Sequence, residues 1–234
     1  MTQKLNFVVA ALLGAAALNA QAAAVGMVSD YPSQTVVSNG LSPLGHTVAL
    51  LSSFTTASLA GLDAVILGRS ATPNAALTAF VFGGGTLITE WSAASYGMGL
   101  LGGVANANYS NASNSSIVFT AAGLAADLGT GLGASYSDSG ATQFFHDFTA
   151  LGNGVVYGTR NSAGGATAIV GGAYGSGTVW VNGYDWGDGP TAPTFKLLSN
   201  QLNRDLAAAT VPEPGSLALV SLALFGAVAL RRRA

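Results

Sequence analysis

Two prolines near the C-terminus limit how far the folded body of this chain can extend. They flank a single acid in Val211-Pro212-Glu213-Pro214. Each proline fixes its own φ angle and has no backbone N–H to donate, so a helix cannot continue through this point. The chain therefore divides here into a body and a separate C-terminal segment, residues 211–234.

The segment after the prolines has the composition of a membrane helix. Residues 215–230 contain no charged side chain, and Arg231, Arg232 and Arg233 follow directly. A spanning helix usually needs about 20 residues, so this one would require local thinning of the bilayer or arginines that reach the head groups. Because arginines are retained on the cytoplasmic side, we expect a transmembrane helix over 215–230 with the body outside. The alternative is a buried C-terminal core helix, against which the three arginines argue.

These features together resemble a known sorting signal. A Pro-Glu-Pro motif, an apolar stretch and a terminal arginine cluster, in this order and at the end of the chain, are similar to the PEP-CTERM signal of Gram-negative bacteria. An exosortase recognises and cleaves that signal. The resemblance covers only residues 211–234 and implies an exported or envelope protein, with an exosortase and membrane lipid as partners, in a bacterium that makes extracellular polysaccharide. It implies nothing about the activity of the body.

The N-terminus also predicts export. Lys4 supplies a short positive region, residues 7–18 an apolar core, and Ala20-Gln21-Ala22 a small-x-small cleavage site. This is the pattern of a secretory signal peptide, and Ala24 offers a nearby alternative site. Because the apolar core is short and small residues follow promptly, we expect a cleaved signal peptide over residues 1–22 rather than an uncleaved anchor.

The body between the two signals, residues 23–208, is long enough for one domain with a substantial core. It carries four basic side chains against nine acidic ones. Without a basic patch to neutralise phosphates, nucleic acid is excluded as a partner. The chain has no cysteine, which excludes disulfides, thiolate metal sites and a cysteine nucleophile. We expect neither a metal site nor a cofactor.

In the first half of the body, short apolar runs typical of strands are followed by a helical segment and then another strand, as in an α/β protein. Short strands are expected at 25–29, 47–51, 63–67 and 86–89, with a helix capped by Thr72 and opened by Pro73 before the last of them. The third run is apolar throughout, which predicts a strand covered on both faces. This order implies a sheet with parallel central strands.

The second half predicts antiparallel strands joined by glycine turns, followed by an amphipathic helix. That helix would turn Lys196, Asn200 and Arg204 toward water. The expected strands cover residues 154–158, 166–170 and 178–182.

This order of elements resembles the glutamine amidotransferase-like fold, a flavodoxin-like three-layer α/β sandwich with a mixed sheet. The resemblance rests on three apolar strand segments bounded by glycines, at 62–68, 83–90 and 177–185. Where active members carry a cysteine, this chain reads Glu90-Trp91-Ser92, and where they carry His-x-Glu it reads Asp185-Trp186-Gly187-Asp188. The resemblance therefore implies a degenerate domain that keeps the scaffold without amidotransferase chemistry.

Four charged residues follow predicted strands: Asp30, Arg69, Glu90 and Asp185. Open α/β sheets hold their ligands at the carboxyl ends of strands, so we expect these four to converge. Three acids and an arginine beside aromatic side chains could bind a polyol or sugar, or hold a hard cation such as calcium. The alternative, slightly favoured, is that the acids face water and Arg69 neutralises Glu90 as an internal ion pair.

Two functions from different classes follow. The preferred one is a non-catalytic envelope or cell-surface protein with a binding or matrix role, for which extracellular polysaccharide is a candidate partner. It would be exported across the inner membrane and anchored by its C-terminal helix or released after processing. The second is a secreted hydrolase acting on extracellular carbohydrate or ester. Neither Ser70 nor Ser92 lies in a Gly-x-Ser-x-Gly motif, and a hydrolase would need one of them beside His46 or His146. We expect no catalytic residue.

Overall fold

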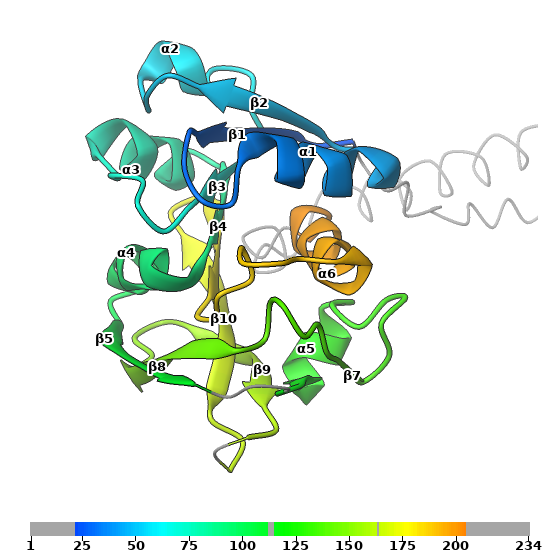
Figure 1. Cartoon of the computed structure of the whole chain (residues 1–234). Helices are drawn as coiled ribbons and strands as arrows, with labels where there is room; N and C mark the ends of the chain where they lie inside the picture. The colour runs from blue at the N-terminus through cyan, green and yellow to red at the C-terminus, as the bar shows by residue number, and fades with distance from the viewer. Residues whose placement is uncertain (1–21, 112–114, 163, 205–234) are drawn as a thin grey trace, which may run out of the picture.

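The computed structural model describes residues 22–111, 115–162 and 164–204 (Figure 1). Its strands are β1 (Ala24–Val28), β2 (Thr47–Leu51), β3 (Ala64–Leu67), β4 (Thr86–Thr89), β5 (Val104–Asn111), β6 (Ile117–Phe119), β7 (Ser135–Tyr136), β8 (Phe144–Ala150), β9 (Val155–Arg160), β10 (Thr167–Tyr174) and β11 (Gly177–Asn182). Its helices are α1 (Gln34–Leu41), α2 (Thr56–Leu59), α3 (Ala75–Phe82), α4 (Ala94–Leu100), α5 (Ala121–Ala125) and α6 (Ala192–Leu202), with short 3-10 helices η1 (Ser42–Leu44) and η2 (Trp91–Ala93).

A mixed sheet forms the centre of the described residues. Nine strands pair within them in the order β2-β1-β3-β4-β11-β10-β9-β6-β7. The run from β2 to β11 is parallel, and each later strand is antiparallel to its neighbour. Strands β5 and β8 form a separate antiparallel pair. The expectation of a mixed α/β fold with parallel central strands is confirmed.

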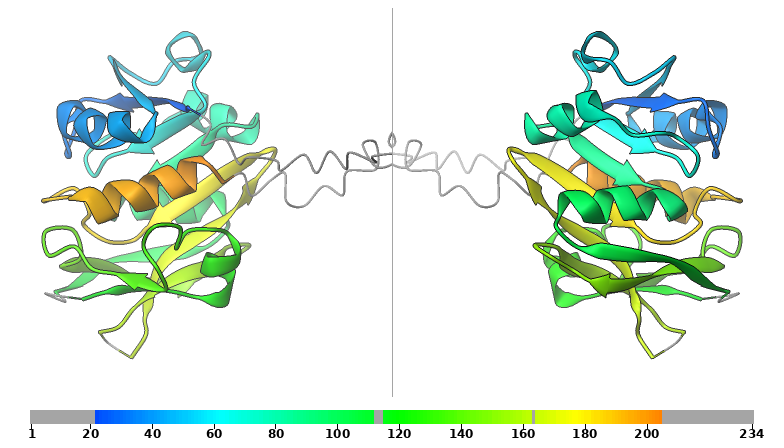
Figure 2. Two further views of the ribbon diagram at one scale, coloured as in Figure 1. Left: turned by 90° about the vertical axis from the view of Figure 1, so that its right-hand side faces the viewer. Right: turned by 90° about the vertical axis from the view of Figure 1, so that its left-hand side faces the viewer.

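Alternate side chains of the central strands enter two different cores, because successive residues of a strand point to opposite faces. In β3, Ala64 and Ile66 belong to one core and Val65 and Leu67 to the other, and all four are buried. Helices α1 and α6 cover the first face, while α2, α3 and α4 cover the second (Figures 1 and 2). The apolar run of β3 therefore reflects a strand covered on both sides.

The start of α3 and one face of α6 differ from expectation. Helix α3 begins at Ala75, and its N-cap is Asn74, whose side chain accepts from the Leu77 N–H at 3.1 Å. Asn200 was expected to face water, and it is only 7% exposed. Its amide donates to two carbonyl oxygens in the loop after α5, because that loop folds over α6.

The two terminal signals fall almost entirely outside the described residues. This applies to the predicted signal peptide, apart from Ala22, and to the whole span predicted over 215–230. Within the ranges that the structure describes, every helix is too short or too polar to cross a bilayer.

Candidate functional site

The carboxyl ends of β3, β4 and β11 meet at one edge of the sheet, since these strands are parallel neighbours. Arg69 follows β3, Glu90 follows β4, and Asp185 follows β11. The Arg69 guanidinium binds Glu90 through two bonds, Nη2 to Oε1 at 2.7 Å and Nε to Oε2 at 3.2 Å. The same Nη2 also contacts the Asp185 carboxylate. The structure thus brings three of the four predicted residues together, including the Arg69–Glu90 pair of the alternative interpretation.

Asp30, the fourth predicted residue, supports the loop that carries Arg69. Its Oδ2 accepts from the backbone N–H of Ser70 at 2.8 Å and of Ala71 at 2.7 Å. Asp30 therefore positions Arg69 through the backbone of the next two residues.

The sequence interpretation missed Asp188 as a member of this cluster. Its Oδ1 lies 3.2 Å from Arg69 Nη2. The turn that carries it is fixed by two bonds, from Trp186 Nε1 to the Thr89 carbonyl at 3.0 Å and from the Gly187 N–H to Glu90 Oε1 at 3.2 Å. A second acid three residues after Asp185 was the available signal.

Two aromatic rings also pack against the guanidinium. Arg69 Cζ lies 4.4 Å from the centroid of the Tyr31 ring and 4.9 Å from that of Trp91. Such contacts contribute on the order of 0.5–2 kcal/mol each, depending on how far the cation is removed from water. They hold the guanidinium plane in place, while Tyr31 as a residue remains 45% exposed.

Burial sets the electrostatics of the cluster. The Glu90 side chain is fully buried, that of Asp185 is 2% exposed, and that of Asp188 is 40% exposed. Burial raises the pKa of Glu90 to about 8; the Arg69 charge opposes this rise and the Asp185 charge adds to it. Burial also raises the pKa of Asp185 to about 6, and the neighbouring Asp188 contributes in the same direction. The cluster therefore takes up protons at a higher pH than free carboxyl groups do.

The possibility of a bound calcium ion, which the sequence left open, finds no support in this geometry. The guanidinium of Arg69 lies where the carboxylates converge, so it fills the position that a cation would take. In the part of the chain that the structure describes, no group of three or more His, Asp or Glu side chains could hold a metal ion.

Ser92 and His46 of the hydrolase alternative lie at opposite edges of the sheet, whereas His146 lies beside Trp91, the residue before Ser92. Ser92 Oγ donates to the Arg69 carbonyl at 2.8 Å, at the carboxyl ends of the strands. His46 lies just before β2, at the amino ends, and its Nε2 is 2.8 Å from Ser199 Oγ. His146 is buried at 4% exposure, with its ring 5.9 Å from that of Trp91.

The tautomer of His46 excludes it as a base for Ser199. Its Nδ1 accepts from the Ala23 N–H at 3.1 Å, so in the neutral ring the proton is on Nε2, which donates to Ser199. A general base would need that nitrogen unprotonated. Burial lowers the pKa of His46, which favours the neutral ring.

The sheet order and its two layers of helices define a class, a mixed α/β domain that is shared with several solved structures. The chain is similar to a cytoplasmic protein from Salmonella typhimurium, with 12% identity over 79% of this chain and 99% of that one, at a TM-score of 0.58. It is also similar to a protein from Thermoplasma acidophilum whose description, a GMP synthase component, is provisional (11% identity, 81% and 96% coverage, TM-score 0.54). A third is a cold-adapted beta-galactosidase from Rahnella sp. R3 (16% identity, 79% of this chain and 32% of that one, TM-score 0.55). At these identities the likeness shows the fold alone.

The comparison for the C-terminal segment gives a more specific result than the comparison of folds. Residues 210–233 match the PEP-CTERM protein-sorting motif, as the sequence predicted. The motif indicates an exported protein that an exosortase sorts. None of the curated proteins compared with this chain matches its sequence.

Proposed function

We propose that this chain is a non-catalytic envelope protein whose body, a degenerate amidotransferase-like domain, binds extracellular polysaccharide at the carboxyl edge of its sheet. The sorting motif at 210–233 supports the destination. The observation that carries the binding role is the cluster around Arg69, in which two buried acidic side chains fix an arginine beside an exposed acid and an exposed aromatic residue.

Asp188 and Tyr31 are the most exposed members of the cluster around Arg69. Asp188 is 40% exposed and Tyr31 is 45% exposed. A carboxylate accepts hydrogen bonds from sugar hydroxyls, and an aromatic ring stacks against the apolar face of a pyranose. Both groups contact Arg69, so they are held near each other before any ligand arrives.

The buried residues make this edge rigid. Glu90 and Asp185 hold the guanidinium, and Asp30 holds the loop on which it is carried. A preorganised surface loses less side-chain entropy on binding than a mobile one. The contacts of Ser92 and His46 described above give no comparable support to the hydrolase alternative, so we favour the binding role.

A glycan array tests this proposal. The exported protein is compared with its Asp188→Ala and Tyr31→Ala variants, and Leu124→Ala on α5 is a matched control, since Leu124 is also 45% exposed. We expect each site variant to weaken binding about tenfold, which corresponds to about 1.4 kcal/mol, and the control to bind like the parent. Equal binding by all four proteins contradicts the site, and release of new reducing ends from the glycans favours the hydrolase instead.

A further inference from the structure

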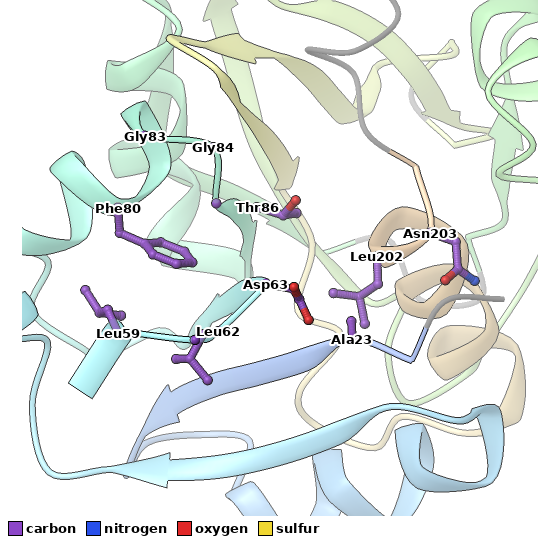
Figure 3. A pocket seen from close by; sticks show the side chains of 12 residues that line it. Ala23, Leu59, Leu62, Asp63, Phe80, Gly83, Gly84, Thr86, Leu202 and Asn203 are labelled. Carbon is purple, nitrogen blue, oxygen red and sulfur yellow. The ribbon is translucent and has the colours of Figure 1, made fainter. Parts of the chain in front are cut away.

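A cavity of about 520 Å³ opens at the amino ends of the strands, on the edge opposite Arg69 (Figure 3). Its wall includes Ala23, Asp63 and Thr86, which precede or begin β1, β3 and β4. Leu202 and Asn203, at the end of α6, also line it. The first and last parts of the described body therefore meet at one cavity.

Fixed contacts of the body begin at Ala23. Ala22 is exposed, whereas Ala23 is only 6% exposed. The Ala23 N–H donates to His46 Nδ1 at 3.1 Å, and the Ala23 carbonyl accepts from the Thr47 N–H at 3.0 Å. Both of these hydrogen bonds join the start of the body to the turn that enters β2.

Ala24 joins the start of the body to Asp63, the residue just before β3. Its N–H donates to Asp63 Oδ2 at 2.7 Å, and its carbonyl accepts from the Asp63 N–H at 2.8 Å. These four bonds favour the small-x-small pattern that ends at Ala22 over the one that ends at Ala24. Cleavage after Ala24 would remove all four, and it would leave buried His46 without the donor to its Nδ1. Cleavage after Ala22 keeps them.

We propose that a signal peptidase hydrolyses the bond between Ala22 and Ala23, and that His46 then binds the α-ammonium group freed on Ala23 at the wall of the cavity. This inference rests on the export proposed above. Water adds across the peptide bond, so the carboxylate remains on Ala22 and the amine on Ala23 takes up a proton. One N–H of the ammonium replaces the amide N–H that donates to His46 Nδ1, and Asp63 in the same wall supplies a negative charge.

His46 is suited to this role by its second bond. Its Nε2 proton is directed to Ser199 Oγ at 2.8 Å, which leaves Nδ1 as the acceptor. Burial lowers the pKa of His46, and a positive charge at Ala23 would lower it further, so the ring stays neutral and continues to accept.

The N-terminal residue of the mature protein tests the cleavage site. The full chain is expressed in a Gram-negative bacterium, and the exported protein is analysed by intact mass and terminal peptide sequencing. We expect a chain that begins with Ala23. A chain that begins with Val25 contradicts this inference and leaves the export proposal standing. A cytoplasmic chain that keeps Met1 contradicts both.

A matched pair of variants separates the two patterns. Ala20→Leu alters only the small-x-small site that ends at Ala22, so we expect it to block or shift processing. Ala24→Val alters only the alternative site, so we expect the same first residue as in the parent. The reverse outcome overturns the inference.

Chemical labelling tests the bound ammonium. In the folded exported protein, we expect reductive methylation of the Ala23 amine to be at least about tenfold slower than in urea, because ordered burial lowers accessibility. His46→Leu should remove most of this protection, whereas His46→Gln, which keeps an acceptor, should retain it. Equal labelling of folded and unfolded parent protein contradicts the bound state, even if His46→Leu fails to fold.

Discussion

Glu90 carries a carboxyl group whose proton affinity depends on folding. Its pKa rises from an ordinary value of 4.5 to about 8 because burial disfavours the charged form. Between these pH values the folded state binds a proton that the unfolded chain releases. The stability contributed by this group is therefore fully present below about pH 4.5 and is lost as the pH rises to about 8.

We predict that the free energy of unfolding falls between pH 6 and pH 8, by up to about 1.4 kcal/mol per pH unit. Glu90→Gln cannot titrate, so its slope over this range should be shallower. Urea unfolding at several pH values measures both slopes. Leu124→Ala, at a residue that is 45% exposed and cannot titrate, serves as the control and should keep the parent slope. Identical slopes in the parent and Glu90→Gln proteins would show that Glu90 does not hold this proton.

Open α/β sheets hold their ligands at the carboxyl ends of their strands, and this rule predicted the convergence of Arg69, Glu90 and Asp185. It needs only the order of the parallel strands. It could not predict Asp188. The turn that returns Asp188 to Arg69 depends on Trp186 bonding to the Thr89 carbonyl, a contact between segments far apart in the sequence. The spacing of Asp185 and Asp188 shows a second acid in this turn, but neither spacing nor local propensity shows that the turn returns to Arg69.

Strand β11 packs against the end of α3 with no room for a side chain at Gly177. A Cβ atom there would collide with the carbonyl oxygens of Val81 and Gly85. Gly99 of α4 differs, since a Cβ atom there meets nothing within 4 Å. The two glycines therefore have opposite roles in their elements.

We predict that Gly177→Ala lowers the free energy of unfolding by about 1–3 kcal/mol through overpacking. Gly99→Ala should raise it by about 0.5–1 kcal/mol, because alanine favours a helix over the unfolded chain. Urea unfolding of both variants measures the difference. If Gly177→Ala is as stable as the parent, β11 and α3 are not in this close contact.

Elements with continuous apolar runs were predicted to within a few residues, among them β3, β4 and β11. Helix α1 and strand β5 were missed. The sequence of α1, QTVVSNGL, is half polar and only eight residues long, and it buries only Val37 and Leu41, so it contains few apolar positions from which a helix could be predicted. Strand β5, VANANYSN, has the composition of a polar loop and is a strand because β8 pairs with it. Tertiary pairing of this kind overrides local propensity.

The sorting motif gives a prediction for the molecule as a whole. In a host with an exosortase, we expect the parent protein to lose its C-terminal peptide. A variant with Arg231, Arg232 and Arg233 changed to Gln should keep it, because the positive charges that are retained on the cytoplasmic side are gone. Mass spectrometry of the C-terminal peptide distinguishes the two. Arg204→Gln, outside the motif, is the control, and processing of the triple variant like the parent would contradict the prediction.

Both ends of the described body lie at the cavity beside Ala23 and Asn203, whereas Tyr31 and Asp188 lie at the far end of the parallel strands. A body tethered to a bilayer through either end would therefore point Tyr31 and Asp188 away from the lipid. A polymer strand in the surrounding matrix would meet Tyr31 and Asp188 first, and the domain would need no additional stalk to reach it.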